Sequence, residues 1–271
     1  MTDQGQAAAV PVHALPEAEQ PSDGALIHKV SPLTEGEPLA AVFSLPQKTG
    51  DKEERFVLTV SRAGMIKKTP AGELPGPSAQ PFTLVRINEG DGLGWVRLTD
   101  GKADLLLMTA RGMGIRFSEE EVRPMGLVAG GVSGIKLAVG DELIGASNLP
   151  AAGEVMILAS DGTAKRMPVK EFPLQGRYGQ GVIACRMAQA VRLVGMLVGK
   201  GTLRGTIHFS RAASRYMRLD EAPQKNRTAR GEPVVEVKAG DHLLAITETW
   251  DAVALWEEEK KPELKKAAKG S

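Results

Sequence analysis

The apolar and polar positions of this 271-residue chain repeat in one pattern about every 50 residues. Each repeat has an alternating apolar run, a tight turn and a second run that carries Lys or Arg, which predicts a β-hairpin. Five segments show the pattern: FVLTVSRAGMIKKTPAGEL (56–74), LLLMTARGMGIRFSEEEV (105–122), VMILASDGTAKRMPVKEF (155–172), TIHFSRAASRYMRLDEA (206–222) and a degenerate LLAITETWDAVALWEEE (243–259). The predicted turns align at Gly64, Gly112, Gly162 and Ala212, which are 48, 50 and 50 residues apart.

Further strands follow each hairpin, together with a second marker. The marker is the glycine of EGEPL, EGDGL, VGDEL and AGDHL, at Gly36, Gly90, Gly140 and Gly240. A third strand is predicted at 82–87, 134–139, 181–187 and 234–239, and a fourth at 93–98, 143–147 and 193–198. One such four-stranded unit cannot bury its own apolar face, so the units must stack on one another. The sequence therefore predicts an all-β, propeller-like array.

The ends of the chain depart from the repeat. Residues 1–9 are polar and Ala-rich, and we expect them to be disordered, while VPVHALPEA (10–18) predicts one strand ended by proline. The charged tail 257–271 predicts a solvated helix or disorder. A single domain is thus expected over residues 10–256.

Composition agrees with a β-rich intracellular protein. The 31 glycines and the low aromatic content of 4% suit short strands joined by turns. The single cysteine, Cys185, excludes an internal disulfide and fits a reducing compartment. With no run of 18 apolar residues and no signal peptide, we expect a cytoplasmic location and no membrane.

The net charge of +1 hides a strong asymmetry. Residues 161–231 hold 14 Lys or Arg against 4 Asp or Glu, a difference of +10, and residues 1–54 hold 3 against 9, a difference of −6. Such segregation concerns partners rather than fold.

The repeat segments resemble the C-terminal domain of the A subunit of bacterial DNA gyrase and topoisomerase IV. The resemblance rests on VSRAGMIKKTPAGEL, GMGIRFSEEEVRPMG and SDGTAKRMPVKEFPLQGRYGQGV, and on VHALPEAEQPSDGALIHKVSPLTEGEPLAAV near the start, and it covers about residues 10–256. It implies a β-pinwheel, a propeller in which neighbouring blades exchange strands, whose basic outer rim binds and bends duplex DNA.

Three departures refine what the resemblance implies. The catalytic core of a type IIA topoisomerase is absent, and so is the Gln-Arg-Arg-Gly-Gly-Lys-Gly box of gyrase, which makes partial wrapping the expectation. The last hairpin also resembles the one that precedes the Leu-Pro-Glu stretch in the family. We therefore expect five or six four-stranded blades, with the first blade shared by the N- and C-terminal strands.

Basic residues are the candidate DNA contacts, because a row of Lys and Arg releases counterions from phosphates. The alternative is that they blunt edge strands against aggregation. The candidates, mostly near the turns and in the Gly-Arg loops, are Arg62, Lys67, Lys68, Arg116, Lys165, Arg166, Arg177, Arg211, Arg215, Arg218, Arg227 and Arg230.

Other chemistry finds little support in the sequence. His13, His28, His208 and His242 lack ligand spacing, so no metal site is expected. The repeated Asp91, Asp141 and Asp241 are predicted turn formers. Without a nucleotide loop or nucleophile motif, no cofactor, no small-molecule substrate and no enzymatic activity are expected. The prediction is a non-catalytic DNA-binding domain, which has type IIA topoisomerase subunits as possible partners; the alternative is a protein-interaction propeller that docks partners through charged faces.

Overall fold

The repeated hairpins are present, and their turns contain the predicted glycines. In this computed structural model, which describes residues 1–45 and 54–248, Gly64, Gly112 and Gly162 have φ values of 83°, 81° and 82°, a region that favours glycine. The hairpins pair β2 (Phe56–Ser61) with β3 (Met65–Pro70), β6 (Asp104–Thr109) with β7 (Met113–Ser118), β10 (Glu154–Ala159) with β11 (Thr163–Pro168), and β14 (Arg204–Phe209) with β15 (Arg215–Arg218).

Each hairpin is joined by one inner strand and, in three cases, by one outer strand. The inner strands are β5 (Leu93–Thr99), β9 (Leu143–Leu149), β13 (Leu193–Gly199) and β17 (Leu243–Glu248), and each pairs with the first strand of the hairpin before it in the chain. The outer strands β8 (Val132–Ser133), β12 (Val182–Ile183) and β16 (Glu232–Pro233) pair instead with the hairpin of the preceding repeat. Neighbouring repeats therefore exchange strands.

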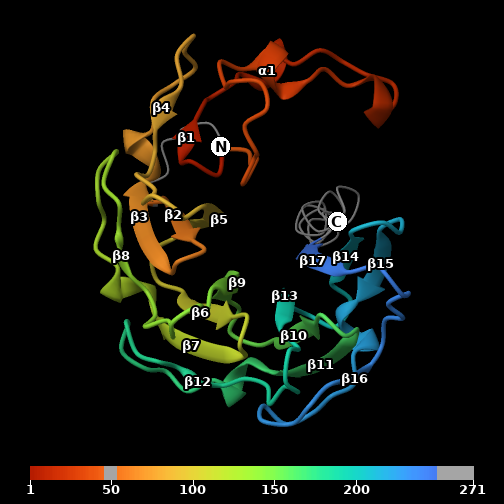
Figure 1. Cartoon of the computed structure of the whole chain (residues 1–271). Coiled ribbons are helices and arrows are strands. Elements are labelled where there is room, and N and C mark those ends of the chain that lie inside the picture. The colour runs from red at the N-terminus through yellow and green to blue at the C-terminus, as the bar shows by residue number, and fades with distance from the viewer. Residues whose placement is uncertain (46–53, 249–271) are drawn as a thin grey trace, which may run out of the picture.

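The result is four blades arranged around a centre (Figure 1). Blade I has the order β8-β3-β2-β5, blade II β12-β7-β6-β9, blade III β16-β11-β10-β13 and blade IV β15-β14-β17. The inner strands lie toward the centre and β8, β12 and β16 lie at the periphery. An all-β, propeller-like fold is thus confirmed, with three four-stranded blades and one three-stranded blade among the described residues.

The apolar core lies between the faces of neighbouring blades. Successive residues of a strand point to opposite faces, so Leu105 and Leu107 of β6 pack toward blade I while Leu106 and Met108 pack toward blade III. Every residue of β2 is buried for the same reason. The middle strands of a blade are therefore covered on both faces.

The third strand of each repeat is much shorter than predicted. In place of 82–87, 134–139, 181–187 and 234–239, the strands are the two-residue β4 (Phe82–Thr83), β8, β12 and β16. After each of them the chain leaves the sheet and crosses the hairpin turn of the preceding blade, where Gly134 N donates to Gly64 O and Ala184 N to Gly112 O. The crossing uses the backbone groups that a longer strand would need.

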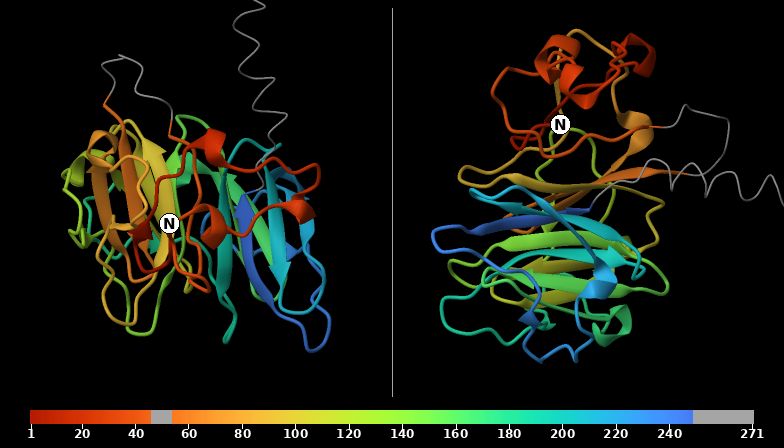
Figure 2. Two further views of the ribbon diagram at one scale, coloured as in Figure 1. Left: turned by 90° about the horizontal axis from the view of Figure 1, so that it is seen from above. Right: turned by 90° about the vertical axis from the view of Figure 1, so that its right-hand side faces the viewer.

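The N-terminus also differs from expectation. Residues 1–9 are not disordered, because Gln6–Ala7 forms β1, which pairs with β4, and the side chain of Thr2 is fully buried. The strand predicted over 10–18 is wrong, since Val12–Ala14 forms the 3₁₀ helix η1. Residues 1–45, which include η2 (Pro21–Asp23) and α1 (Ile27–Val30), span the side of the ring between blades I and IV (Figures 1 and 2).

Short 3₁₀ helices end the second strand of every hairpin. They are η3 (Ala71–Glu73), η4 (Glu119–Glu121), η5 (Val169–Glu171) and η6 (Leu219–Glu221). The expected fifth hairpin over 243–259 begins instead with β17, the inner strand of blade IV; its remainder and the tail 257–271 lie outside the described residues.

Candidate nucleic-acid interface

Two of the candidate lysines are buried inside the fold. Lys67 and Lys165 have no exposed surface, although both follow the hairpin turns as predicted. The ammonium of Lys67 donates to Leu84 O, and that of Lys165 donates to Asn226 O (3.0 Å), Arg227 O and Ala229 O (2.7 Å). Burial lowers the pKa of Lys67 from 10.5 to about 8 and also lowers the pKa of Lys165. Lys67 thereby attaches blade I to the segment that follows β4, and Lys165 attaches blade III to the loop that precedes β16.

Lys68 is buried beside an internal carboxylate. Its Nζ lies 4.0 Å from Oε1 of Glu119, donates to Glu119 O at 3.2 Å, and lies 5.0 Å from the centre of the Phe56 ring. Thr99 Oγ1 donates to the other carboxylate oxygen of Glu119. Burial raises the pKa of Glu119, while the hydroxyl of Thr99 and the charge of Lys68 oppose that effect. This cluster joins blade I to the start of η4 in blade II.

Arg116 and Arg166 occupy equivalent places in β7 and β11 and form equivalent contacts. Arg116 donates to Asp104 through Nε (2.9 Å) and Nη2 (2.6 Å), and Arg166 pairs with Glu154. Each also donates to a carbonyl of the following repeat, Phe172 O and Ala222 O respectively. Both guanidinium groups hold two repeats together.

Arg177 and Arg227 fix the peripheral loops. Arg177 donates through its guanidinium to Ser133 O, and its backbone N donates to Glu121 at 2.7 Å. Arg227 repeats both contacts, with Ile183 O and with Glu171. The Gly-Arg loops predicted to approach phosphate thus hold the exchanged outer strands in place.

The remaining candidates are exposed. They are Arg62, Arg211, Arg215, Arg218 and Arg230. Arg218 pairs with Asp220 at 3.1 Å, and the guanidinium of Arg215 lies 5.7 Å from the centre of the Phe209 ring. The structure therefore leaves a smaller set of candidate side chains accessible than the sequence suggested.

A row of exposed basic residues was missed by the sequence reasoning. Arg86, Lys136 and Arg186 are exposed, lie 50 residues apart, and form no ion pair among the residues that the structure describes. The signal was available, because Arg86 and Lys136 each precede the second glycine marker by four residues, and Arg186 precedes Ala190 by four. We call Arg86, Lys136 and Arg186 the crossing row.

The crossing row lies beside the hairpin turns. Each member is on a segment that leaves an outer strand and crosses a turn, as shown by the bond from Gly134 N to Gly64 O and that from Ala184 N to Gly112 O. Arg62, Arg111 and Arg211 are exposed at the turns themselves, and Nη2 of Arg111 lies 3.4 Å from Gly140 O on such a segment. This end of the blades, which we call the turn face, therefore gathers exposed positive charge from several repeats.

The repeated aspartates stabilise the turn face, as predicted. Oδ1 of Asp91, Asp141 and Asp241 accepts from the backbone N of Ala63, Arg111 and Arg211. The Ser210 hydroxyl and three backbone amides lower the pKa of Asp241 to about 2.

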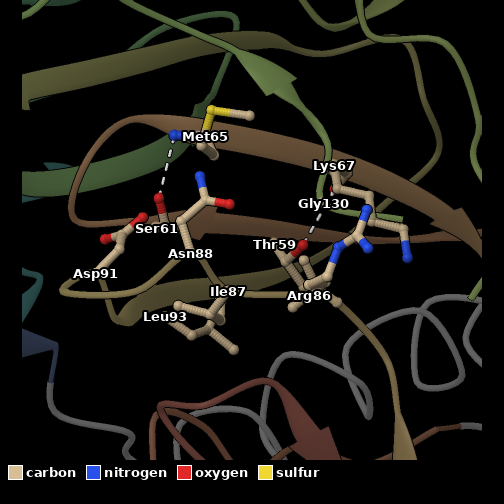
Figure 3. A pocket seen from close by; sticks show the side chains of 11 residues that line it. Thr59, Ser61, Met65, Lys67, Arg86, Ile87, Asn88, Asp91, Leu93 and Gly130 are labelled. Atoms are coloured by element: carbon tan, nitrogen blue, oxygen red, sulfur yellow. Dashed lines mark hydrogen bonds between the residues drawn. The ribbon is translucent and has the colours of Figure 1, made fainter. Parts of the chain in front are cut away.

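A small pocket in blade I is part of this framework. It is lined by Thr59, Ser61, Lys67, Asp91 and neighbouring residues (Figure 3). Ser61 Oγ accepts from Met65 N at 3.1 Å and Thr59 Oγ1 donates to Lys67 O, so these polar groups stabilise the hairpin.

Within the described ranges, no three His, Cys, Asp or Glu side chains gather as metal ligands would. None of the helices in residues 1–45 and 54–248 has the length and apolar character needed to cross a membrane.

Comparison with solved structures identifies the fold. The C-terminal domain of DNA topoisomerase IV superposes with a TM-score of 0.83 at 24% identity, and the match covers 92% of this chain and 77% of that one. The DNA gyrase A C-terminal domain gives a TM-score of 0.65 at 14% identity, covering 80% and 76%.

Sequence comparison places the repeats in a family. The chain is 34% identical over 178 residues to the DNA gyrase A subunit of Klebsiella oxytoca, which is 66% of this chain and 20% of that protein. It is 28% identical over 260 residues to the DNA gyrase A subunit of Mycobacterium tuberculosis, which is 90% of this chain and 29% of that protein. The chain thus spans less than a third of these relatives. Residues 55–99, 103–150, 153–200 and 216–248 match the family described as DNA gyrase C-terminal domain, beta-propeller, and the chain belongs to that family.

Proposed function

We propose that this chain is a non-catalytic domain that binds and bends duplex DNA. Its matched region corresponds to the C-terminal domain of the gyrase A subunit, which is a small part of that protein. We further propose that it acts with the catalytic subunits of a type IIA topoisomerase, in the cytoplasm. Chemistry on DNA would then belong to those subunits, and this domain would supply the path of the duplex.

The observation that carries the proposal is the repetition of exposed positive charge on the turn face. Arg86, Lys136 and Arg186 recur at the same place in three successive repeats, while the fourth repeat has Glu236 there. The three basic residues have no acidic partner among the described residues, so their charges remain available to phosphates. Contacts spaced around a curved array hold a duplex in a curved path. Bending 20–30 base pairs costs about 1–6 kcal/mol, which several phosphate contacts must offset.

The structure changes which residues we propose as contacts. The exposed candidates Arg62, Arg211, Arg215 and Arg230 stay in the proposed interface, joined by Arg111 and the crossing row. Arg218 is left out, because it lies at the end of β15 away from the hairpin turn and pairs with Asp220. Lys67, Lys68 and Lys165 are buried, and Arg116, Arg166, Arg177 and Arg227 direct their guanidinium groups to internal carboxylates and carbonyls. We assign these seven side chains to holding the blades rather than to phosphate contact.

The test is charge reversal of the crossing row. The triple change Arg86→Glu, Lys136→Glu and Arg186→Glu should weaken duplex binding about equally for unrelated sequences, because phosphate contacts carry no sequence information. The slope of log affinity against log salt should fall by about 0.9 for each phosphate that the variant no longer neutralises. Fluorescence anisotropy with two unrelated 30-base-pair duplexes at several salt concentrations measures both effects.

A matched control keeps the same change in net charge on other surfaces. Lys29, Lys102 and Lys200 are exposed, and Lys102 and Lys200 lie in the connections at the ends of the blades opposite the hairpin turns. Lys29→Glu, Lys102→Glu and Lys200→Glu should leave the salt slope nearly unchanged. If both triple variants lost the same amount of affinity for duplex DNA, only the overall charge would matter. If the unaltered protein did not bind duplex DNA at all, the alternative of docking protein partners would be favoured.

A further inference from the structure

Blade IV ends in an open strand edge. In blades I, II and III an outer strand pairs with the two residues that follow the turn glycine. Blade IV has no outer strand among the described residues, and β15 is its outermost strand (Figure 1). Ala213 and Ser214, which follow Ala212 at the turn, lie outside β15, which begins only at Arg215. The second strand of this hairpin is therefore shorter where the outer strand is missing.

The backbone of Tyr216 faces the open edge. β15 pairs with β14 in the same register as β11 with β10, so Tyr216 is the equivalent of Arg166. Arg166 N donates to Pro223 O at 3.0 Å, and Arg166 O accepts from Lys225 N at 3.0 Å. Neither backbone group of Tyr216 has such a bond within the part of the chain that the structure describes. The edge thus presents a backbone donor and a backbone acceptor that blade III uses.

The side chain of Tyr216 is exposed as well. It is 75% exposed, whereas Lys68, its equivalent in blade I, is 4% exposed. The next residue, Met217, points to the opposite face and is 5% exposed, in the same core cluster as Leu219. β15 is therefore anchored in the core through one face while its edge stays accessible.

The hairpin that carries this edge is positively charged. Residues 204–218 contain four arginines and no aspartate or glutamate, and all four arginines are exposed. Arg218 pairs with Asp220, but Arg204, Arg211 and Arg215 form no ion pair with any residue in 1–45 or 54–248. Complementary charge favours association, so the edge suits an acidic partner.

An extended peptide fits the edge better than a nucleic acid does. Phosphate oxygens accept hydrogen bonds, so a duplex backbone could use the N–H of Tyr216 but offers no donor to its carbonyl. An extended peptide supplies both a donor and an acceptor at the spacing of a sheet. Strand addition of this kind takes its affinity from main-chain bonds and its specificity from side chains.

We propose that the β15 edge of blade IV binds an extended, acidic segment of a partner protein by strand addition. The segment takes the position that β16 holds in blade III, with its backbone bonded to Tyr216 and its carboxylates near the arginines of the hairpin. Carboxylates form strong, charge-assisted hydrogen bonds with arginine. The proposal does not depend on DNA binding by the turn face.

Synthetic peptides test the proposal with the full-length chain. The probe is a labelled ten-residue peptide of alternating glutamate and valine, and fluorescence anisotropy measures its affinity. A second peptide has the same sequence with N-methyl groups on four successive central residues, which removes backbone donors and keeps the charge. It should bind about tenfold more weakly, because two or more hydrogen bonds are lost. A third peptide, with lysine in place of glutamate, should not bind measurably.

Hydrogen exchange of the Tyr216 amide locates the bound peptide. Followed by NMR, this amide should exchange fast in the free protein and slowly with the glutamate–valine peptide. Tyr216→Pro removes the N–H that faces the edge and is tolerated on an edge strand, so this variant should bind the peptide about tenfold more weakly. Tyr216→Val keeps the N–H and should bind as the unaltered protein does. If the proline variant does not fold, the exchange measurement on the unaltered protein still decides.

Several outcomes would overturn the proposal. Equal binding of the methylated peptide, or none of the unmodified one, would exclude strand addition. A Tyr216 amide already protected in the free protein would mean that this chain covers its own edge, and protection that grows with protein concentration would indicate a second copy. Protection by a 30-base-pair duplex, with none by the peptide, would assign the edge to nucleic acid.

Discussion

At the scale of single residues, the exposure of a basic side chain separates two roles. Lys67 is fully buried in β3 and bonds to Leu84 O, whereas Arg86, two residues beyond that carbonyl, is exposed. A buried ammonium loses hydration, which disfavours its charged form. Lys67 therefore makes stability depend on pH, while Arg86 can respond to an external anion.

Lys67→Met tests the buried role. With a folded pKa of about 8 against 10.5 in the unfolded chain, the protonated amine disfavours folding fully below pH 8, and this cost disappears as the pH rises through 10.5. The stability of the unaltered protein relative to the variant should therefore rise between pH 7.5 and 9.5, by about 1–3 kcal/mol. Urea unfolding of both proteins at the two pH values measures the difference, and parallel pH profiles would contradict the burial of the charge.

Residue positions were predictable where one rule decides them. The turn glycines followed from spacing and from the need for positive φ. The fate of Lys67 and Lys68 was not predictable from alternation, because that argument assumes one face of the strand is solvated. Here neighbouring blades cover both faces of β3, so both lysines are buried.

At the scale of elements, contacts between blades repeat with small changes in chemistry. Glu121 and Glu171, the last residues of η4 and η5, accept the backbone N of Arg177 and Arg227, each in the loop of the next repeat. Between blades I and II, Glu119 meets Lys68 and Thr99 with no exposure to solvent. These contacts hold the exchanged strands, which the two-residue pairings of β8 and β12 alone would hold weakly.

The variant Lys68→Met tests how far the contact between blades I and II depends on the ion pair of Lys68 with Glu119. The variant leaves the buried carboxylate of Glu119 without its lysine, which should cost about 2–4 kcal/mol at pH 7.5. Since burial raises the folded pKa of Glu119, the carboxyl takes up a proton on acidification and the deficit should shrink at pH 5. Urea unfolding at both pH values is the measurement. Adding Glu119→Gln should restore stability at pH 7.5, and a deficit equal at both pH values would mean that packing alone is lost.

The strands themselves were predictable in part. The hairpins and the inner strands β5, β9 and β13 lie where the apolar runs place them, because those runs fill the space between blades. The outer strands were predicted too long, since apolar residues such as Leu84 and Val85 are buried under a turn rather than in a sheet. A hydrophobic pattern reports burial but does not distinguish these two surroundings.

At the scale of the whole molecule, the order of strands along the chain matters most. Each repeat gives its outer strand to the blade before it, so no blade is built from one continuous segment where that exchange occurs. The repeat period predicted the array, but the exchange itself came from the family resemblance. The positive charge of the turn face is also a property of the whole ring. Its exposed basic residues come from repeats that are distant in sequence and adjacent around the ring.

The last prediction concerns what such an array does to closed circular DNA. If the turn face curves the duplex, the protein should constrain a small amount of writhe without any nucleotide. A plasmid relaxed by an added type I topoisomerase in its presence, and then deproteinised, should show a topoisomer distribution shifted by an amount that grows with protein concentration. The triple variant of Arg86, Lys136 and Arg186 should shift it less than the control variant of Lys29, Lys102 and Lys200, because only the former removes phosphate-binding charges along the curved path. An unshifted distribution at saturating protein, with binding still detected, would mean that the domain holds DNA without bending it.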